Sequence, residues 1–188
     1  MKKFFLKGNI LCARPQLKDI FFSKSLIYLT HHSKEGAVGI ILNYKITNIK
    51  GVDLFDKLKI KSNGSNSNIS FPFHIGGPLS QNNGFILHSS DYKNKSTMKI
   101  SNNVYLTVST DILIDIAQGK GPKDFFISLG YSGWGPGQLE DEIKNNSWIN
   151  LKEQMDLLFE KDTEDKWKSA IERTGIDFSK FLNFSGSA

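Results

Sequence analysis

The run from Phe125 to Leu129 constrains the fold of this chain more than any other segment. It is apolar apart from Ser128, and an apolar strand without alternation is typical of a sheet interior that is covered on both faces. A glycine-rich turn follows it, and a helical pattern runs from about Gln138 to Lys144. We therefore expect a central strand whose exit leads through a tight turn into a helix.

Shorter strand and helix patterns surround this element. Strand-like runs occupy Asn9–Ala13, Ser25–Leu29, Ala37–Leu42 and Gly84–His88, and alternation on either side of Asn102-Asn103 predicts a hairpin of residues 98–100 and 104–108. Helical patterns occupy residues 52–58, 112–117, 151–159 and 167–174. Strands dominate the first two thirds and helices the last third. This order predicts an α+β fold with a mixed, mostly antiparallel β-sheet and helices concentrated in the C-terminal third.

The length of 188 residues predicts a single compact domain that spans residues 1–188. Residues 61–70 are almost all Ser, Asn and Gly. Such a segment has too little apolar surface to bury, so we expect a flexible loop there.

The formal charge of +5 does not predict a nucleic-acid site. Arg14 and Arg173 are the two arginines, and the lysines are scattered among acids rather than clustered. A nucleic-acid footprint is a clustered basic patch or stripe. We therefore do not expect specific nucleic-acid binding.

Several features predict a soluble cytoplasmic protein without a membrane partner. No apolar run approaches the roughly 18 residues that cross a bilayer. The opening residues mimic a signal peptide, but Lys7 and Gly8 interrupt them before an apolar core can form. The single cysteine, Cys12, cannot form an intrachain disulfide, which fits a reducing compartment. It lies within the apolar strand-like run Asn9–Ala13 and is interpreted as a small buried hydrophobe.

Four motif blocks occur in order along the chain. They read H-x-x-x-G-A-x-G-hydrophobic-hydrophobic-hydrophobic-N, then G-G-P followed by G-F-hydrophobic-L-H, then S-x-D-x-L, then L-G-Y-x-x-W with G-Q-L-E-x-E-I and W. In this sequence they lie at His32–Asn43, Gly76–Pro78 with Gly84–His88, Ser109–Leu113, and Leu129–Trp148. Four blocks in order, over roughly residues 8–178, are far more specific than one short motif.

This set resembles the YqgE/AlgH family. One position departs from the pattern: Lys45 stands where that family often has proline. The resemblance implies a compact α+β fold on a mixed sheet, with the motif segments on one side. It implies little about activity, since members are generally uncharacterised and some are labelled putative transcriptional regulators without a recognisable DNA-binding motif. The helix pair at the end of the chain is interpreted as packing elements, because acidic Glu164-Asp165 at the second helix would repel DNA phosphates.

The histidines do not form a metal signature. His31 and His32 are adjacent, so on a strand they point to opposite faces and cannot both bind one metal. No two histidines stand at the i, i+4 spacing of a zinc helix. No metal and no cofactor is therefore expected. For His32, a structural hydrogen bond to the turn at Gly36 is the favoured interpretation.

The glycine-rich segment before the helix does not predict a phosphate site. It lacks G-K-[ST], and the acids that open the helix would repel a second anion. The glycines are interpreted as a tight turn that admits Trp134 to the core. A second hypothesis is that Trp134, Gln138 and Glu140 line a pocket for a neutral or cationic small molecule.

These observations favour a non-catalytic binding or regulatory protein whose ligand is a small molecule or a protein of unknown identity. No catalytic residue is assigned. The candidate binding surface consists of His32, Asn43, Gly76, Gly77, Pro78, His88, Trp134, Gln138 and Glu140. The alternative is a small-molecule hydrolase that uses His32 or His88 with Glu140 or Glu142 as its acid–base pair.

Overall fold

The structure is a computed structural model, and it describes residues 5–47, 72–159 and 165–175. The chain divides into two compact units. The first unit combines residues 1–43 with residues 133–188, and the second consists of residues 44–132. The predicted helix at 52–58 and the predicted flexible loop at 61–70 lie outside the described residues. One domain over residues 1–188 stays a prediction.

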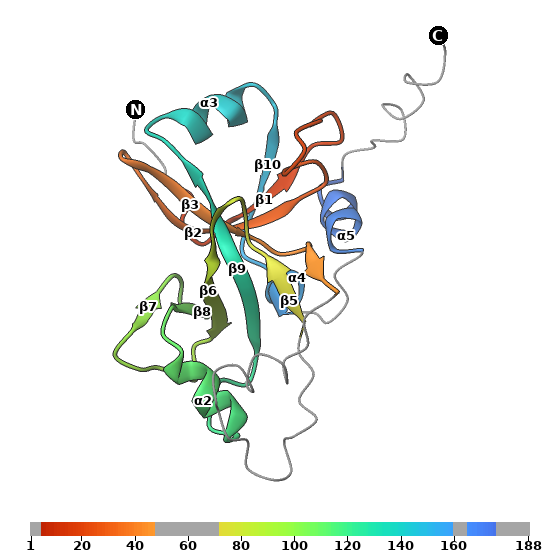
Figure 1. Ribbon diagram of the computed structural model, residues 1–188. Coiled ribbons are helices and arrows are strands. Elements are labelled where there is room, and N and C mark those ends of the chain that lie inside the picture. The colour runs from red at the N-terminus through yellow and green to blue at the C-terminus, as the bar shows by residue number, and fades with distance from the viewer. Residues whose placement is uncertain (1–4, 48–71, 160–164, 176–188) are drawn as a thin grey trace. The chain divides into compact units, whose positions relative to one another are not determined.

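The first unit contains a four-stranded antiparallel sheet in the order β10-β1-β2-β3 (Figure 1). Its strands are β1 (Ile10–Ala13), β2 (Leu26–Ser33), β3 (Gly36–Ile41) and β10 (Trp148–Leu151). All four residues of β1 and the first five of β2 are buried. Consecutive buried residues on a strand point to both faces, so both faces of this sheet are covered.

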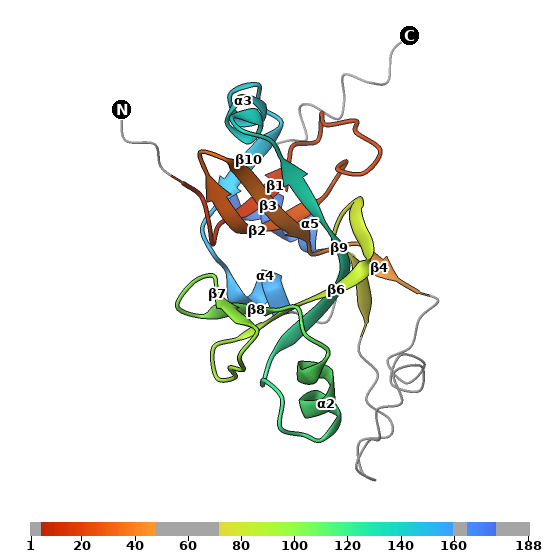
Figure 2. The same cartoon turned by 60° about the vertical axis from the view of Figure 1, so that its left-hand side comes forward.

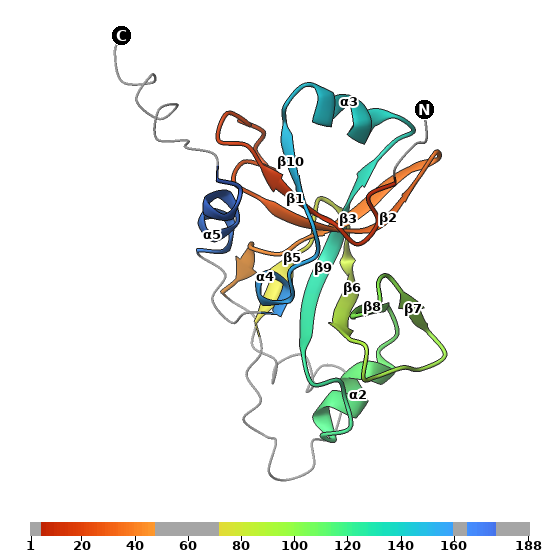
Figure 3. The ribbon, with the colours of Figure 1, turned by 180° about the vertical axis from the view of Figure 1, so that it is seen from behind.

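The helices of the first unit are α3 (Gln138–Lys144), α4 (Met155–Phe159) and α5 (Lys166–Arg173). Helix α5 contacts β1 and β2 (Figure 3). The indole of Trp167 donates a hydrogen bond of 2.7 Å to the carbonyl of Ala13. This packing confirms the interpretation of the last helices as packing elements. Leu151, expected in a helix, is instead the last residue of β10, because the edge of β1 offers it a strand partner.

The second unit contains β4 (Lys45–Ile46), β5 (Phe73–Ile75), β6 (Leu79–Ser89), β7 (Thr97–Lys99), β8 (Val104–Thr107) and most of β9 (Phe125–Trp134). The strands β9-β6-β8-β7 pair antiparallel, and β5 adds to the other side of β9 in parallel. Strand β9 is therefore internal, as the sequence predicts, and Phe126, Ile127 and Ser128 are buried in succession. The predicted hairpin of β7 and β8 is confirmed.

Helix α2 (Asp111–Ala117) covers the core of the second unit (Figure 2). The buried cluster combines Ile112, Leu113, Ile116 and Ala117 of the helix with Phe73, Ile86 and Ile127 of the strands. Across the described residues the strands pair mostly antiparallel and the helices are few and short. The predicted concentration of helices in the C-terminal third is not clearly seen, because α2 lies in the middle third.

None of the helices in the described part of the chain is long and apolar enough to cross a bilayer.

Candidate functional site

The nine residues of the predicted surface fall into both units. His32, Asn43, Trp134, Gln138 and Glu140 belong to the first unit, and Gly76, Gly77, Pro78 and His88 belong to the second. The predicted surface therefore consists of two separate groups of residues, one in each unit.

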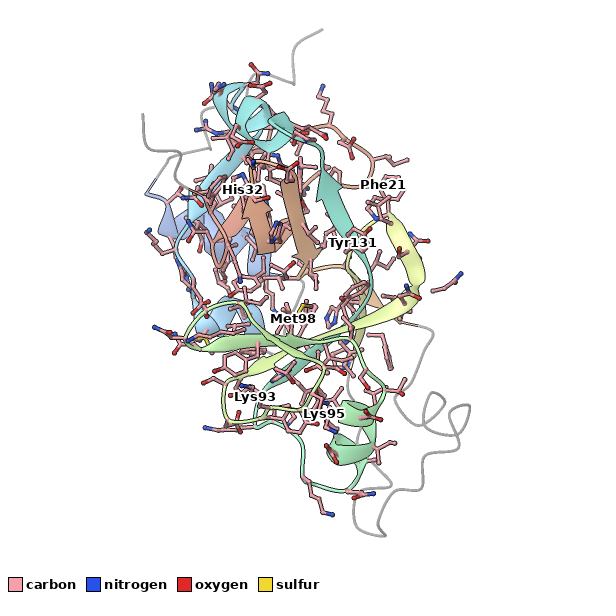
Figure 4. The ribbon with its side chains drawn as sticks, turned by 90° about the vertical axis from the view of Figure 1, so that its left-hand side faces the viewer. Phe21, His32, Lys93, Lys95, Met98 and Tyr131 are labelled. Atoms are coloured by element: carbon pink, nitrogen blue, oxygen red, sulfur yellow. The ribbon has the colours of Figure 1, made fainter. Side chains whose placement is uncertain are left out.

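Strand β2 separates the two adjacent histidines, as the sequence predicts. His31 is exposed and its Nε2 lies 3.1 Å from the hydroxyl of Ser33. His32 points to the other face and is 94% buried, since its relative exposure is 6%. Figure 4 labels His32 in the sheet below α3. The alternation of a β-strand thus puts one of the two rings into the body of the unit.

The segment before β1 determines the tautomer of the neutral His32 ring. The backbone N–H of Leu6 donates to Nδ1 of His32 at 2.9 Å, and the ring of Phe5 meets the imidazole edge-on with centroids 5.4 Å apart. A backbone amide can only donate, so Nδ1 must present its lone pair. The single proton of the neutral ring then sits on Nε2. The predicted hydrogen bond from His32 to the Gly36 turn is not formed, because Leu6 occupies Nδ1.

Within residues 5–47, 72–159 and 165–175, the other nitrogen of His32 has no hydrogen-bond partner. Nε2 is buried, and its charged neighbour is Oε1 of Glu140 at 3.5 Å. That separation is short enough for an ion pair once the ring is charged, but it is longer than the usual 2.7–3.2 Å of an N–H···O hydrogen bond. The Glu140 side chain is 31% exposed. A buried N–H donor thus lies beside a carboxylate that solvent can reach.

Trp134 pairs with Glu142 rather than with Glu140. The indole N–H groups of Trp134 and Trp148 donate to Oε2 of Glu142 at 2.9 and 2.7 Å, and the side-chain amide of Gln138 donates to Oε1 at 2.9 Å. Gln138 also accepts the backbone N–H of Gly135 at 3.0 Å. Glu142 is thus a structural acceptor whose two oxygens are both in use. The i, i+4 spacing of Gln138 and Glu142 on α3 is the sequence signal for this contact.

The aromatic rings around Glu142 form a packed cluster. Phe22 lies 6.2 Å from Trp134 and 5.9 Å from Trp148, and the two tryptophans lie 6.1 Å apart, all as ring centroids. These are the separations of aromatic rings in direct contact. Trp134 is 6% exposed and Trp148 3% exposed. The interpretation that the tight turn admits Trp134 to the core is therefore confirmed, and its indole is part of the core rather than a pocket wall.

Asn43 is used by the fold. Its Oδ1 accepts the backbone N–H of Leu26 at 2.8 Å, and its Nδ2 donates to the carbonyl of Lys24 at 2.9 Å. Lys24 has a positive φ of 55°, a conformation that costs free energy in a residue with a side chain. The amide of Asn43 offsets that cost by holding the turn that leads into β2.

Backbone crossing explains two of the motif glycines. A Cβ on Gly77, whose φ is +154°, would lie 2.2 Å from the carbonyl carbon of Tyr131, and a Cβ on Gly36, with φ of +128°, would lie 2.3 Å from the carbonyl oxygen of Trp134. No side chain fits at either position. Gly76 also donates its N–H to the carbonyl of Leu129 at 2.7 Å. Gly76 and Gly77 thus hold β9 in place within the second unit, and Pro78 follows them, half-buried.

His88 is fully buried with both ring nitrogens in use. Nδ1 lies 2.9 Å from the carbonyl of Ser89 and therefore carries the proton, and Nε2 accepts from the hydroxyl of Thr107 at 2.9 Å. Burial lowers the pKa of His88 below its usual value, against smaller raising effects of the Ser89 bond and the Asp91 charge. His88 is thus a neutral ring built into the sheet of the second unit.

Two further types of chemistry were considered. Burial in β1 raises the pKa of Cys12 to about 12, so the thiol stays protonated and acts as a small hydrophobe. Within the described ranges, no three His, Cys, Asp or Glu side chains are grouped to hold a metal ion.

Comparisons with known proteins give the same family as the motif blocks. A family model described as AlgH-like matches residues 10–179. A UPF0301 protein of Bradyrhizobium diazoefficiens is 40% identical over 190 residues, covering 98% of this chain and 89% of its own length. A UPF0301 protein of Nitrosospira multiformis is 37% identical over 188 residues, covering all of both chains.

Solved structures agree. The solution structure of the AlgH protein from Pseudomonas aeruginosa matches with a TM-score of 0.77 and 30% identity, over 100% of this chain and 98% of that one. A crystal structure of a Corynebacterium diphtheriae protein matches with a TM-score of 0.72 over 92% of this chain and 89% of that one, and at 18% identity it shows the fold alone. The resemblance seen in the sequence is confirmed, and the chain belongs to the AlgH-like family.

Proposed function

We propose that this chain is a non-catalytic binding protein with a regulatory role, and that His32 and Glu140 form the polar centre of its binding site. The observation that carries the proposal is the buried Nε2–H of His32, which has no hydrogen-bond partner among the residues that the structure describes and lies 3.5 Å from Glu140. Buried donors in folded proteins are nearly always paired, and an exception calls for an explanation. A ligand that supplies the missing acceptor is such an explanation.

The chemistry of the pair defines the ligand class. Nε2–H offers a donor, and the partly exposed Glu140 carboxylate offers a negatively charged acceptor. A ligand group that both accepts and donates, such as a hydroxyl or an amide, satisfies both. A cationic group near Glu140 would add an ion pair. Asn43 and Gln138 of the same unit have their polar atoms engaged by the protein, so they are not offered to a ligand.

The hydrolase alternative has weaker support. A general base needs a free lone pair within reach of substrate. The Nδ1 lone pair of His32 is occupied by Leu6, and its Nε2 carries the proton. Both nitrogens of His88 are engaged in a fully buried environment.

The regulatory role is proposed to act through a small ligand or a protein partner, and without sequence-specific DNA binding. The scattered lysines support this, as does the packing of α5 on β1 and β2. We also propose a cytoplasmic location, which the single, buried and unpaired Cys12 supports.

The binding site can be tested by NMR with small probes at one fixed pH. Acetamide, ethanol and ethylammonium are titrated into the isotope-labelled chain while the His32 ring and the Glu140 backbone amide are followed. Saturable shifts of both signals are expected, and Glu140→Gln should weaken binding of ethylammonium several-fold. Asp141→Asn is the matched control, because Asp141 is an exposed acid on the same helix that pairs with Lys144. Probes that leave both signals unmoved would refute the site.

A second assay separates binding from catalysis. Hydrolysis of p-nitrophenyl acetate should proceed at the same rate with the unmodified chain and with His32→Gln. A rate that disappears in His32→Gln, while the variant keeps its fold, would favour the hydrolase instead.

A further inference from the structure

The ring of His32 is covered by two residues, Phe5 and Leu6, which are here named the N-terminal strap. The strap touches the ring in two ways, through the Leu6 N–H bond to Nδ1 and through the edge-on contact of Phe5. Directly after the strap the backbone is fastened to β2, since Gly8 donates to Leu29 and Leu29 donates to Asn9, at 2.8 and 2.9 Å. The strap thus directly precedes a backbone segment that is hydrogen-bonded to β2, and it makes its own contacts with the ring.

The strap contact depends on the protonation of the ring. Leu6 can donate to Nδ1 only while that nitrogen has a free lone pair. Nε2 already carries a proton, so the next proton that the ring takes goes to Nδ1. Nδ1 then becomes a donor that faces the Leu6 donor, and the hydrogen bond is lost. We propose that the N-terminal strap is a pH-sensitive cover, closed on neutral His32 and released when the ring takes its second proton.

The charges around the ring favour this switch. From α3, the carboxylate of Glu140 lies 3.5 Å from Nε2 and stabilises a charged ring. From β3, the residue paired with His32 is Ala37, which does not titrate. On β2 itself His31 is exposed on the opposite face, and Lys7 after the strap is exposed. Because a proton on Nδ1 and the Leu6 hydrogen bond exclude each other, protonation and release promote each other.

The strap adds regulation of access to the His32 ring, which the proposed function uses as its binding site. To that extent the strap proposal rests on the proposed function. The release of the strap nevertheless requires no ligand. It is measured on the free chain over a range of pH, whereas ligand binding is measured at one pH. Failure of one experiment therefore leaves the other standing.

The test follows hydrogen exchange of the Leu6 amide and the ring signals of all four histidines in the full chain, from about pH 8 to about pH 5. After correction for the intrinsic pH dependence of exchange, protection of Leu6 is expected to fall roughly five- to tenfold, the range of one lost hydrogen bond. The fall should follow the titration of His32. Protection of the Leu29 amide, which is bonded to Asn9, should stay unchanged.

Three variants sharpen the result. His32→Gln removes the titrating ring and should abolish the pH dependence at Leu6. His31→Gln, on the exposed face, should leave it intact. Glu140→Gln removes the carboxylate that lies 3.5 Å from Nε2 and should move the release to lower pH. Unchanged Leu6 protection while His32 titrates in the unmodified chain would overturn the proposal. A release that follows another histidine would do the same.

Discussion

His32 in the first unit and His88 in the second are both buried strand histidines within family motifs, yet their rings are held in opposite ways. His88 donates from Nδ1 to Ser89 and accepts at Nε2 from Thr107. His32 accepts at Nδ1 from Leu6, and its Nε2–H lies beside Glu140 without a hydrogen-bond partner in the described part of the chain. The difference teaches that burial of a histidine does not by itself mark a site. The donor without a partner marks the site, because buried donors are nearly always paired within the protein and a ligand can supply the missing acceptor.

The aromatic cluster bonds Glu142 on α3, the helix that carries Glu140, and its loss is expected to have the largest effect. Trp134→Ala should lower the free energy of unfolding by about 3–5 kcal/mol, through lost burial and a cavity. Trp134→Phe keeps an aromatic ring and loses the N–H bond to Glu142. Its loss of unfolding free energy should therefore be much smaller than that of Trp134→Ala. Chemical denaturation measures both. A loss under about 1 kcal/mol for Trp134→Ala would show that the indole lines an open pocket.

Replacing each buried histidine by leucine compares the two regions directly. His88→Leu leaves the Thr107 hydroxyl and the Ser89 carbonyl without the ring, and Thr107 is fully buried. The Thr107 hydroxyl keeps Thr97 as a partner at 2.8 Å, so one group loses its partner and a loss of about 1–3 kcal/mol is expected. His32→Leu removes one hydrogen bond, from a Leu6 N–H that is half-buried, and should cost about 1 kcal/mol. Equal losses measured by denaturation would contradict the comparison.

The pH dependence of stability should report His88. Its folded pKa is lowered, so the unfolded chain binds the proton more tightly. The associated stability is present above the ordinary histidine pKa of about 6.5, and it is lost as pH falls from there through the lowered value. Unfolding midpoints from about pH 8 to about pH 5 should decline in the unmodified chain, and the decline should shrink in His88→Gln. An undiminished decline in that variant would assign the effect to other groups.

The sequence anticipated local features better than the pairing of distant ones. The bounds of α3 and α2 and the internal position of β9 follow from glycines and apolar runs. The strand character of Trp148–Leu151 does not, because it depends on pairing with β1, which is far away in sequence. For the same reason the sequence could name Trp134, Glu140 and Glu142 as neighbours but could not say which carboxylate the indole contacts. The contact between Leu6 and His32, 26 residues apart, has no sequence signal.

Glu140→Gln is expected to have the smallest effect on stability. Glu140 is a partly exposed acid in the first turn of α3, so its interaction with the helix dipole contributes only about 0.3–1 kcal/mol. The change should be nearly silent in thermal unfolding while it weakens the ligand binding proposed for the site. Glu142→Gln is the contrast, since it disturbs a carboxylate that accepts from two indoles, and it should cost more. A large loss for Glu140→Gln would make Glu140 a structural residue instead.

The tautomers of the two rings test the central claim most directly. Long-range ¹H–¹⁵N correlation spectra distinguish a proton on Nδ1 from one on Nε2, and the spectra are recorded at about pH 8, where an ordinary histidine is neutral. The expected result is opposite tautomers, with the proton of His32 on Nε2 and that of His88 on Nδ1. A His32 ring that carries its proton on Nδ1 would mean that Leu6 does not occupy that nitrogen, and both the unpaired donor and the strap would then be refuted.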